Sequence, residues 1–286
     1  MTRKKSLVRA KGALRIGLRH AILIAGAAIF VLPFYWLIVT SLKSDIQILN
    51  ATTLTEMLVP DPVVFSNYPK TLNYMDFGRY FLNTTLVALL SIIGITLASS
   101  MVAFSFARLK WPGRDIFFII LLSTMMLPHQ VTMIPLYLIY SKIGWVNSLK
   151  PLWAPSFFGH AFFIFLLRQF YKTIPRDFMD AAKIDGCNYF QIYWKIMFPL
   201  VRPAIITIVI FQFMWSWNDF LGPLIYIHDR LLMTMSQALQ ALQSANSSEW
   251  SMLMAASAVM TIPVIIVFFF AQRYFIQGVV LTGLKE

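Results

Sequence analysis

Six stretches of this chain are apolar over the length that a helix needs to cross a membrane. They cover residues 21–41, 83–106, 116–140, 152–170, 204–221 and 252–274. About 20 such residues in a helix span the roughly 30 Å hydrocarbon core of a bilayer. None of the stretches alternates with the period of two that a membrane β-strand requires, and a helix satisfies its own backbone in lipid. The sequence therefore predicts an all-α integral membrane protein with six transmembrane helices.

The composition excludes an ordinary soluble domain. Of the 286 residues, 58% are hydrophobic and 13% are charged, whereas charged residues make up about a quarter of a soluble domain. The longest intervening stretch, residues 42–82, contains Pro60, Pro62 and Pro69 and several Asn, Thr and Ser residues. It is turn-rich and too short for a sizeable core of its own. We interpret it as an external loop and leave open a role as a docking ledge for an external partner.

The basic residues indicate which loops face the cytoplasm, because Lys and Arg are retained on the cytoplasmic side of short loops. With the N-terminal tail inside, the six-helix topology places most of the 24 basic residues inside. The exceptions are Lys43, Lys70, Arg79, Lys142, Lys150 and Arg230. This distribution predicts that both termini are cytoplasmic.

The net charge of +12 does not indicate a nucleic-acid-binding protein. The basic residues are scattered over loops, and no zinc-finger, helix-turn-helix or RNA-binding pattern accompanies them. The basic N-terminus followed by an apolar run also fits a cleaved signal peptide, but the run continues through Ile38, beyond the usual 7–15 residue core. We favour a retained first helix.

The single Cys187 has no partner for an intramolecular disulfide and is assigned a packing role.

Motifs for nucleotide binding or hydrolysis are missing. The segment from Gly12 to Gly17 has the glycine interval of a phosphate loop but continues with Leu18-Arg19 instead of Lys followed by Ser or Thr. The four histidines are isolated, without an HExxH pair, and no GxSxG elbow is present. We therefore predict a protein with no catalytic residues, no metal site and no cofactor of its own.

One polar segment between the fourth and fifth apolar stretches is predicted to fold into two short helices bounded by prolines. The first helix begins near residue 176 and ends at Gly186, the residue best suited to a left-handed helix stop. The second begins at Asn188, with Gln191 three residues later as a variant of the capping box.

The second of these helices carries large side chains at helical spacing, which predicts a single apolar face. They are Phe190, Tyr193, Trp194 and Met197. A groove in a soluble partner would accept that face. An alternative that the residues leave open is an amphipathic helix lying flat among lipid headgroups, where Trp, Tyr and Lys are common.

This segment resembles the EAA motif of ABC importer permeases, in which Glu-Ala-Ala, Gly, Ile and Leu-Pro follow at fixed spacing. The corresponding positions are Asp180-Ala181-Ala182, Gly186, Ile196 and Phe198-Pro199, with Asp for Glu and Phe for Leu. Further matches in order include Pro33-Phe34-Tyr35-Trp36, Met126-Leu127-Pro128, Leu167-Arg168-Gln169-Phe170, Trp217-Asn218-Asp219-Phe220 and Gln272-Arg273-Tyr274-Phe275. Together they are similar to the carbohydrate-importer branch, which includes the maltose-transporter G subunit.

The resemblance implies a type I importer permease in the prokaryotic plasma (inner) membrane. It implies residues 1–20 as a basic cytoplasmic tail, 21–76 as the first helix and external loop, 77–275 as the transmembrane domain, and 276–286 as a cytoplasmic tail. A cytoplasmic coupling loop would occupy residues 172–203. Its coupling residues would be Asp180, Ala181, Ala182, Asp185, Gly186, Phe190, Ile196 and Pro199.

The resemblance also implies that other subunits supply the chemistry and half of the pathway. The expected partners are a second homologous permease subunit, two nucleotide-binding ATPase subunits that bind ATP and Mg²⁺, and an external solute-binding protein. The expected substrate is a carbohydrate, with an oligosaccharide favoured. A permease for a non-sugar solute such as glycerol phosphate stays an alternative.

Residues of the substrate path are sought among polar groups inside the apolar stretches, since such groups usually face a bundle interior or a water-filled cavity. Asp219 is the only carboxylate there, and Trp215 and Asn218 nearby suit sugar rings and hydroxyls. His129 and Gln130 follow Pro128, where the helix backbone can open toward a cavity.

Alternatives to a substrate role remain for these residues. Asp219 also suits the outer end of the fifth helix, just before Gly222-Pro223, and Pro128 also suits a plain helix kink. A secondary transporter would use Asp219 with His129 or His160 as an ion relay. A channel or membrane scaffold would need no energised partner, but neither class explains the EAA-like segment.

Overall fold

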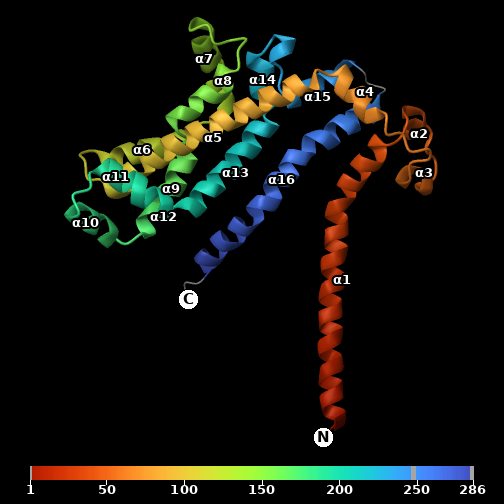
Figure 1. The fold of residues 1–286 in the computed structure, drawn as a ribbon, viewed down its shortest axis with the longest axis horizontal. Coiled ribbons are helices and arrows are strands. Elements are labelled where there is room, and N and C mark those ends of the chain that lie inside the picture. Colours follow the sequence, from red (N-terminus) through yellow and green to blue (C-terminus); the bar gives the residue numbers. More distant parts are fainter. Residues whose placement is uncertain (1, 246–248, 284–286) are drawn as a thin grey trace. The chain divides into compact units, whose positions relative to one another are not determined.

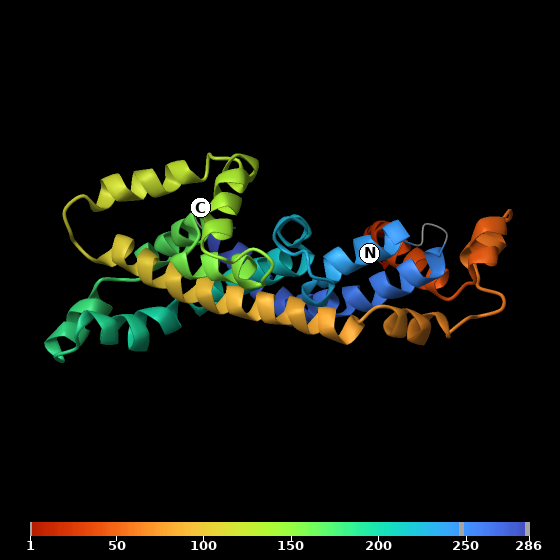
Figure 2. The same ribbon diagram turned by 90° about the horizontal axis from the view of Figure 1, so that it is seen from above.

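The computed structural model describes residues 2–245 and 249–283, and the side chains of residues 16–244 and 249–272. Every regular element in this part of the chain is a helix (Figures 1 and 2), which confirms the predicted all-α class. The predicted tails and Arg273-Tyr274-Phe275 lie wholly or partly outside the described side chains. The chain forms two compact units, one comprising the chain up to Tyr74 with Leu242–Met260 and the other comprising Met75–Ala241 with the chain from Thr261.

The first unit contains the long helix α1 (Thr2–Ser41) and three short helices in the predicted external loop. These are α2 (Asp45–Asn50), α3 (Leu54–Leu58) and α4 (Asn67–Tyr74). Each of the short helices α2 and α3 begins with a reciprocal capping box, formed by Ser44 with Gln47 and by Thr53 with Glu56. These boxes help helices of only six and five residues to form. Backbone N–H groups of Thr52 and Thr53 donate to the Glu56 carboxylate and lower its pKa.

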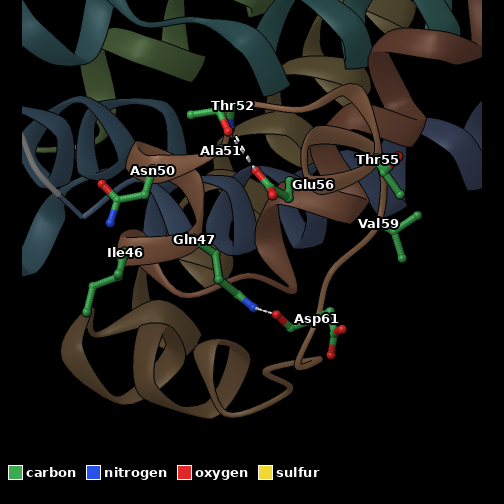
Figure 3. Close-up of a pocket in the computed structure, with 9 residues that line it drawn as sticks. All are labelled: Ile46, Gln47, Asn50, Ala51, Thr52, Thr55, Glu56, Val59 and Asp61. Atoms are coloured by element: carbon green, nitrogen blue, oxygen red, sulfur yellow. Dashed lines mark hydrogen bonds between the residues drawn. The ribbon is translucent and has the colours of Figure 1, made fainter.

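Lys43 holds parts of this loop together through hydrogen bonds. The sequence analysis had used this residue only as a basic residue on the external side of the membrane. Its side chain is 3% exposed, and Nζ donates to the carbonyls of Glu56 at 2.7 Å and Met57 at 2.6 Å. Desolvation by burial lowers the pKa of this ammonium group. An open hollow of about 450 Å³ lies between α2 and α3 and is lined by Gln47, Asn50, Glu56 and Asp61, among others (Figure 3).

The second unit is built around α5 (Phe77–Arg108), which packs against α9 (Ala161–Thr173) and α13 (Arg202–Asn218) (Figure 1). Small residues on α5 and α13, Ala103 and Ala204, are fully buried and let these helices approach closely. The fully buried Phe163, Leu167 and Tyr171 on α9 fill the space between them.

The remaining helices of the second unit are short. They are α6 (Arg114–Thr124), α7 (His129–Lys142), α8 (Lys150–Trp153), η1 (Ala154–Phe158), α10 (Asp177–Ile184), α11 (Tyr189–Ile192), η2 (Tyr193–Met197), α12 (Phe198–Leu200), α14 (Leu221–Tyr226) and η3 (Arg230–Leu232). The helices α15 (Met235–Ala245) and α16 (Trp250–Gly283) contribute residues to both units.

The structure changes the form of the predicted spans. In the described residues, three helical segments are long and apolar enough to cross a membrane, namely Ile16–Ser41, Phe77–Arg108 and Trp250–Gln272, and two bent pairs raise the number to five. The predicted span 116–140 is divided: α6 and α7 meet at 98° (Figure 2), because Pro128 takes an extended conformation before α7. The break lies at the proline for which a kink was considered. The count of six stays a prediction.

The fourth and fifth predicted spans also differ in detail. Residues 152–170 are divided among α8, η1 and α9, with a break at Gly159, whose φ of 81° is left-handed. The fifth helix ends at Asn218 instead of residue 221, and it joins the segment Tyr189–Leu200 at 78°. The first break contains Gly159, which adopts a left-handed conformation that ends a helix. At the second break, the Asp219 carboxylate accepts the Gly222 N–H in place of a helical hydrogen bond.

We predict that Gly94→Ala destabilises the second unit and Gly78→Ala does not. A Cβ on Gly94 would come within 2.5 Å of the Phe157 ring, whereas one on Gly78 would meet nothing within 4 Å. Overpacking of this kind costs about 1–3 kcal/mol. Thermal unfolding of the two α5 variants in detergent would measure the difference, and equal midpoints would contradict the packing of η1 on α5.

Candidate functional site

The polar segment 172–203 contains the predicted helix stop. The helix α10 ends at Ile184, and Gly186 adopts φ 79°. The backbone N–H of Cys187 donates to the carbonyl of Ala182 at 2.9 Å, which closes the helix in the Schellman manner. A Cβ on Gly186 would meet nothing within 4 Å, so the backbone conformation alone favours glycine here.

The predicted capping box is also present. The backbone N–H of Gln191 donates to Asn188 Oδ1, and the backbone N–H of Asn188 donates to Gln191 Oε1, both at 2.9 Å. These reciprocal bonds fix the start of α11, which continues through the π-helical η2 and α12 toward α13.

The single apolar face predicted for the second helix is wrong. Tyr193 and Met197 are buried in the core, whereas Phe190 and Trp194 are 65% and 49% exposed. Tyr193 reaches α5 through its hydroxyl, which lies 2.7 Å from that of Ser100. The π-helical turn changes the helical register at this point. The segment therefore has one face packed on the bundle and another aromatic face left uncovered.

The helix α10 is divided in the same way. Met179 and Ala182 face the core, whereas Asp180, Ala181 and Asp185 are exposed. Large apolar side chains are exposed beside them: Phe178 is 49% exposed and Ile184 is 87% exposed. Uncovered apolar groups rimmed by charged ones are typical of a protein interaction site.

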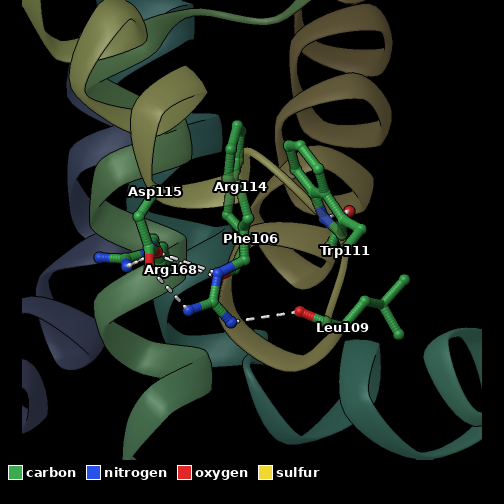
Figure 4. A network of polar contacts seen from close by, with 7 residues as sticks. Phe106, Leu109, Trp111, Arg114, Asp115 and Arg168 are labelled. Carbon is green, nitrogen blue, oxygen red and sulfur yellow. Dashed lines mark hydrogen bonds and ion pairs between the residues drawn. The ribbon is translucent and has the colours of Figure 1, made fainter.

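A polar network fixes the end of α9 just before this segment (Figure 4). Arg168, which is 9% exposed, lies over the Phe118 ring at 3.8 Å and donates to the Phe106 carbonyl at 3.4 Å. Its charge also lies 4.0 Å from Asp115 Oδ1, and Arg114 donates two hydrogen bonds to the same carboxylate, at 3.0 and 3.2 Å. The connection from α5 to α6 is thereby attached to α9.

This network was missed by the sequence analysis, which used Arg168 only as part of a family motif. The available signal was an arginine inside the predicted span 152–170. An ionisable residue within an apolar stretch calls for a named partner.

A cavity of about 900 Å³ brings most of the predicted substrate-path residues together. It is lined by His129, Trp215, Asn218 and Asp219, together with Gln212, Ser216, Tyr140 and Tyr226. Gln130 does not line it. The walls of this cavity include parts of α5, α7, α8, α13 and α14. Residues that are distant in the sequence, such as His129 and Asp219, therefore line the same space.

Asp219 both ends the fifth helix and lines this cavity, so the two alternatives left open for it are compatible. It stands at the C-cap of α13, and its Oδ1 accepts a hydrogen bond from the Gly222 N–H at 3.1 Å. A Cβ on Gly222 would collide with the same carboxylate. Trp215 stacks on Phe163 at 5.1 Å between ring centroids and is 46% exposed.

His160 does not lie where the ion-relay alternative requires it, beside Asp219 in the cavity. It does not line the cavity, and its Nδ1 accepts the backbone N–H of Phe162 at 3.3 Å, capping α9. Its ring packs against Phe163 and Trp215. Of the two histidines considered as relay partners of Asp219, only His129 shares its cavity.

The sequence profile of the family described as "Binding-protein-dependent transport system inner membrane component" matches residues 94–280 of this chain. The chain belongs to this family. The match includes the segment 172–203 and nearly all the residues that line the 900 Å³ cavity. The protein is accordingly a non-catalytic membrane component of a transport system.

Two relatives match this chain over nearly their whole length. It is 32% identical to the arabinooligosaccharides transport system permease protein AraQ of Bacillus subtilis (strain 168), over 90% of this chain and 91% of the relative. It is 30% identical to the osmoprotective compounds uptake permease protein GgtD of a Synechocystis species, over 93% and 91%. A crystal structure of a bacterial ABC transporter that imports alginate contains a chain of the same fold, with a TM-score of 0.78, 24% identity and coverage of 91% and 96%.

We predict that Asn188→Ala frays the start of α11 at a cost of about 1 kcal/mol, because the Gln191 N–H loses its acceptor. Hydrogen exchange at residues 189–192 should accelerate, while exchange in α10 stays unchanged. Asn188→Asp keeps an acceptor oxygen and serves as the control. Equal protection in both variants would show that the box does not hold the segment.

Proposed function

We propose that this chain is the membrane-spanning permease subunit of an ATP-binding cassette importer for a carbohydrate. The observation that carries the proposal is the segment 172–203, which has one face packed into the bundle core and an uncovered face of charged and aromatic residues. A separate ATPase subunit that binds ATP and Mg²⁺ would cover that face. A second permease subunit and a second ATPase would complete the complex.

The packed face suits this segment to transmit movement. The side chains of Ile192, Tyr193 and Met197 are buried in the same core as α5 and α9. The caps at Gly186 and Asn188 restrict its internal motion. A displacement imposed on the exposed residues Asp180, Ala181 and Asp185 would therefore carry the bundle with it, provided that the ATPase binds the segment differently in its two nucleotide states.

We further propose six membrane crossings with both termini cytoplasmic, in an inner membrane. Three helices and two bent pairs supply up to five crossings by length and composition. The sixth would consist of α8, η1 and α9 together, with Arg168 and Lys172 at the cytoplasmic end. The distribution of basic residues over the connecting loops supports this orientation.

The cavity supports an uncharged, ring-bearing solute. It combines an aromatic face (Trp215), amides (Gln212 and Asn218) and one carboxylate (Asp219). Carboxylates and amides bind hydroxyl groups, and tryptophan stacks on sugar rings. A single carboxylate would repel an anionic solute such as glycerol phosphate, and relatives of the chain are described as permeases for arabinooligosaccharides and for osmoprotective compounds.

An ion-coupled secondary transporter is the second candidate, because His129 and Asp219 line the same cavity. Dissipating the ion gradient with ATP present would stop that transporter and leave an ATP-driven importer active.

In the importer, a solute-binding protein would deliver the substrate from outside. We propose the hollow between α2 and α3 as its docking ledge.

We predict that Gly186→Val leaves the protein inserted but abolishes substrate-stimulated ATPase activity of the complex. A β-branched residue at φ 79° strains the backbone by roughly 1–3 kcal/mol and disturbs the stop of α10. Gly144→Val is the matched control, since Gly144 also has a positive φ of 68° and open space around it but lies at the end of α7. Equal loss of activity in the two variants would argue against a specific role of the segment.

We predict that Trp215→Ala lowers the maximal uptake rate in proteoliposomes by roughly tenfold, a loss comparable to that of one stacking contact with a sugar ring. A saccharide panel in the ATPase assay would first identify the substrate. Phe213→Ala removes a comparable aromatic group from the same helix, outside the cavity lining. Unchanged uptake by Trp215→Ala would remove this residue from the path.

A further inference from the structure

A smaller polar cavity, of about 290 Å³, lies between the end of α5 and the segment α10–α11. Five of the nine residues that line it are basic: Arg108, Lys110, Arg114, Arg176 and Lys183. Asp180 is the one acidic residue in the lining. An adjoining hollow shares Lys110, Arg114 and Arg176 with it and adds Trp111 and Asp115, and Figure 4 shows Arg114 and Asp115 close together at this point.

The positive charge in this cavity is only partly neutralised. Arg114 is paired with Asp115, and Arg108 donates to the carbonyls of Tyr171 and Ile174. The Nε atom of Arg108 is buried without a hydrogen-bond partner in the described part of the chain, and Arg176 is close enough to repel Arg108.

The other basic residues at the cavity also lack acidic partners. Among the described residues, no salt bridge involves Lys110, Arg176 or Lys183, and Asp180 has no basic partner within 4.0 Å. Lys183 lies 5.2 Å from the centre of the Tyr189 ring. Cationic groups that converge with so little counter-charge create a strongly positive potential, which favours an anion in the space between them.

The position of the cavity identifies the kind of anion. Arg108 is the last residue of a 32-residue helix that is long and apolar enough to cross a membrane, and Trp111 follows three residues later. Tryptophan and basic residues at the end of a transmembrane helix are typical of the headgroup level. Guanidinium forks and lysine ammonium groups together bind the oxygens of a phosphate.

We propose that this basic cavity binds a phosphate group, either in the headgroup of an anionic phospholipid or on a small soluble molecule. Its lining residues Asp180 and Lys183 belong to α10 and Arg176 precedes that helix as its N-cap, whereas Arg108 and Lys110 belong to the end of α5 and the connection that follows. A bound phosphate would therefore join the start of α10 to the end of α5. Occupancy of the site would regulate the mobility of the segment that we assign to the ATPase contact.

The test uses the full-length chain, purified in an uncharged detergent, and native mass spectrometry. The probes are dioctanoyl phosphatidic acid, dioctanoyl phosphatidylglycerol, inorganic phosphate, and dioctanoylglycerol as the phosphate-free control. We expect a phosphate-bearing probe to bind in preference to dioctanoylglycerol. Retention of the lipids alone would identify a headgroup, and retention of inorganic phosphate with equal affinity would identify a soluble source.

Paired variants locate the site. Lys110→Gln with Arg176→Gln should weaken binding by about tenfold or more. Lys142→Gln with Lys150→Gln removes the same charge from exposed residues outside the lining and should not weaken it. Lys110→Arg with Arg176→Lys preserves the charge and should retain binding, which separates a lost ligand from a misfolded chain.

Several outcomes would overturn the proposal. One is equal affinity for dioctanoylglycerol and the phosphate-bearing probes, and another is equal weakening in the two neutralised variants. A third is unchanged phosphate binding by Lys110→Gln with Arg176→Gln while association with the ATPase subunit is lost, which would assign the cluster to a protein contact. Since phosphate binding is measured on the chain alone, a failure of this proposal can be distinguished from a failure of the proposed transport function, which the ATPase measurements test.

Discussion

Backbone N–H and C=O groups inside a bilayer have no water to bind, so each break in a membrane helix needs a polar group nearby. In the second unit, three breaks meet this requirement in different ways. The ring of His160 accepts the Phe162 N–H after the turn at Gly159. The carboxylate of Asp219 accepts the Gly222 N–H, and the turn before Pro128 is closed by bonds such as Met126 N–H to the Ser123 carbonyl. Two of these breaks also place polar side chains at the 900 Å³ cavity.

The same unit connects the cavity to the segment 172–203 through packed side chains. Arg108 at the end of α5 donates to carbonyls at the end of α9, and Tyr193 in η2 reaches Ser100 on α5. Arg168 then attaches the start of α6 to α9. These contacts join α5, α6, α9 and η2. In the proposed importer, a movement of α10 and α11 would reach α5, which contributes Val87 to the cavity lining.

What the sequence predicted correctly depends on local chemistry. The left-handed stop at Gly186 and the box of Asn188 with Gln191 are properties of a few neighbouring residues, and both are present. The all-α class follows from the requirement of the bilayer itself. His129 and Asp219 were both predicted to face a cavity because intramembrane polar groups tend to face an interior space. They line the same one.

What the sequence missed depends on contacts between distant residues or on a break in helical register. The burial of Lys43 requires carbonyls from a helix more than ten positions away. Tyr193 is buried and Trp194 is 49% exposed, because the bundle covers only one side of the broad apolar stripe that the pattern predicted. A kink at Pro128 was among the interpretations of the sequence, but the sequence does not give its angle of 98°.

The dual position of Asp219 bears on the choice between an ATP-driven and an ion-driven transporter. A carboxylate that accepts the Gly222 N–H has a structural role in its ionised form, whereas an ion relay needs it to change state in each cycle. Protonation would weaken the bond that ends α13 and would alter the cavity wall at the same time. In the proposed importer, the segment 172–203 would receive the driving movement without this conflict, because its exposed face is separate from the groups that hold the helices in place. The division of labour between a structural carboxylate and a separate driving surface therefore favours the ATP-driven importer.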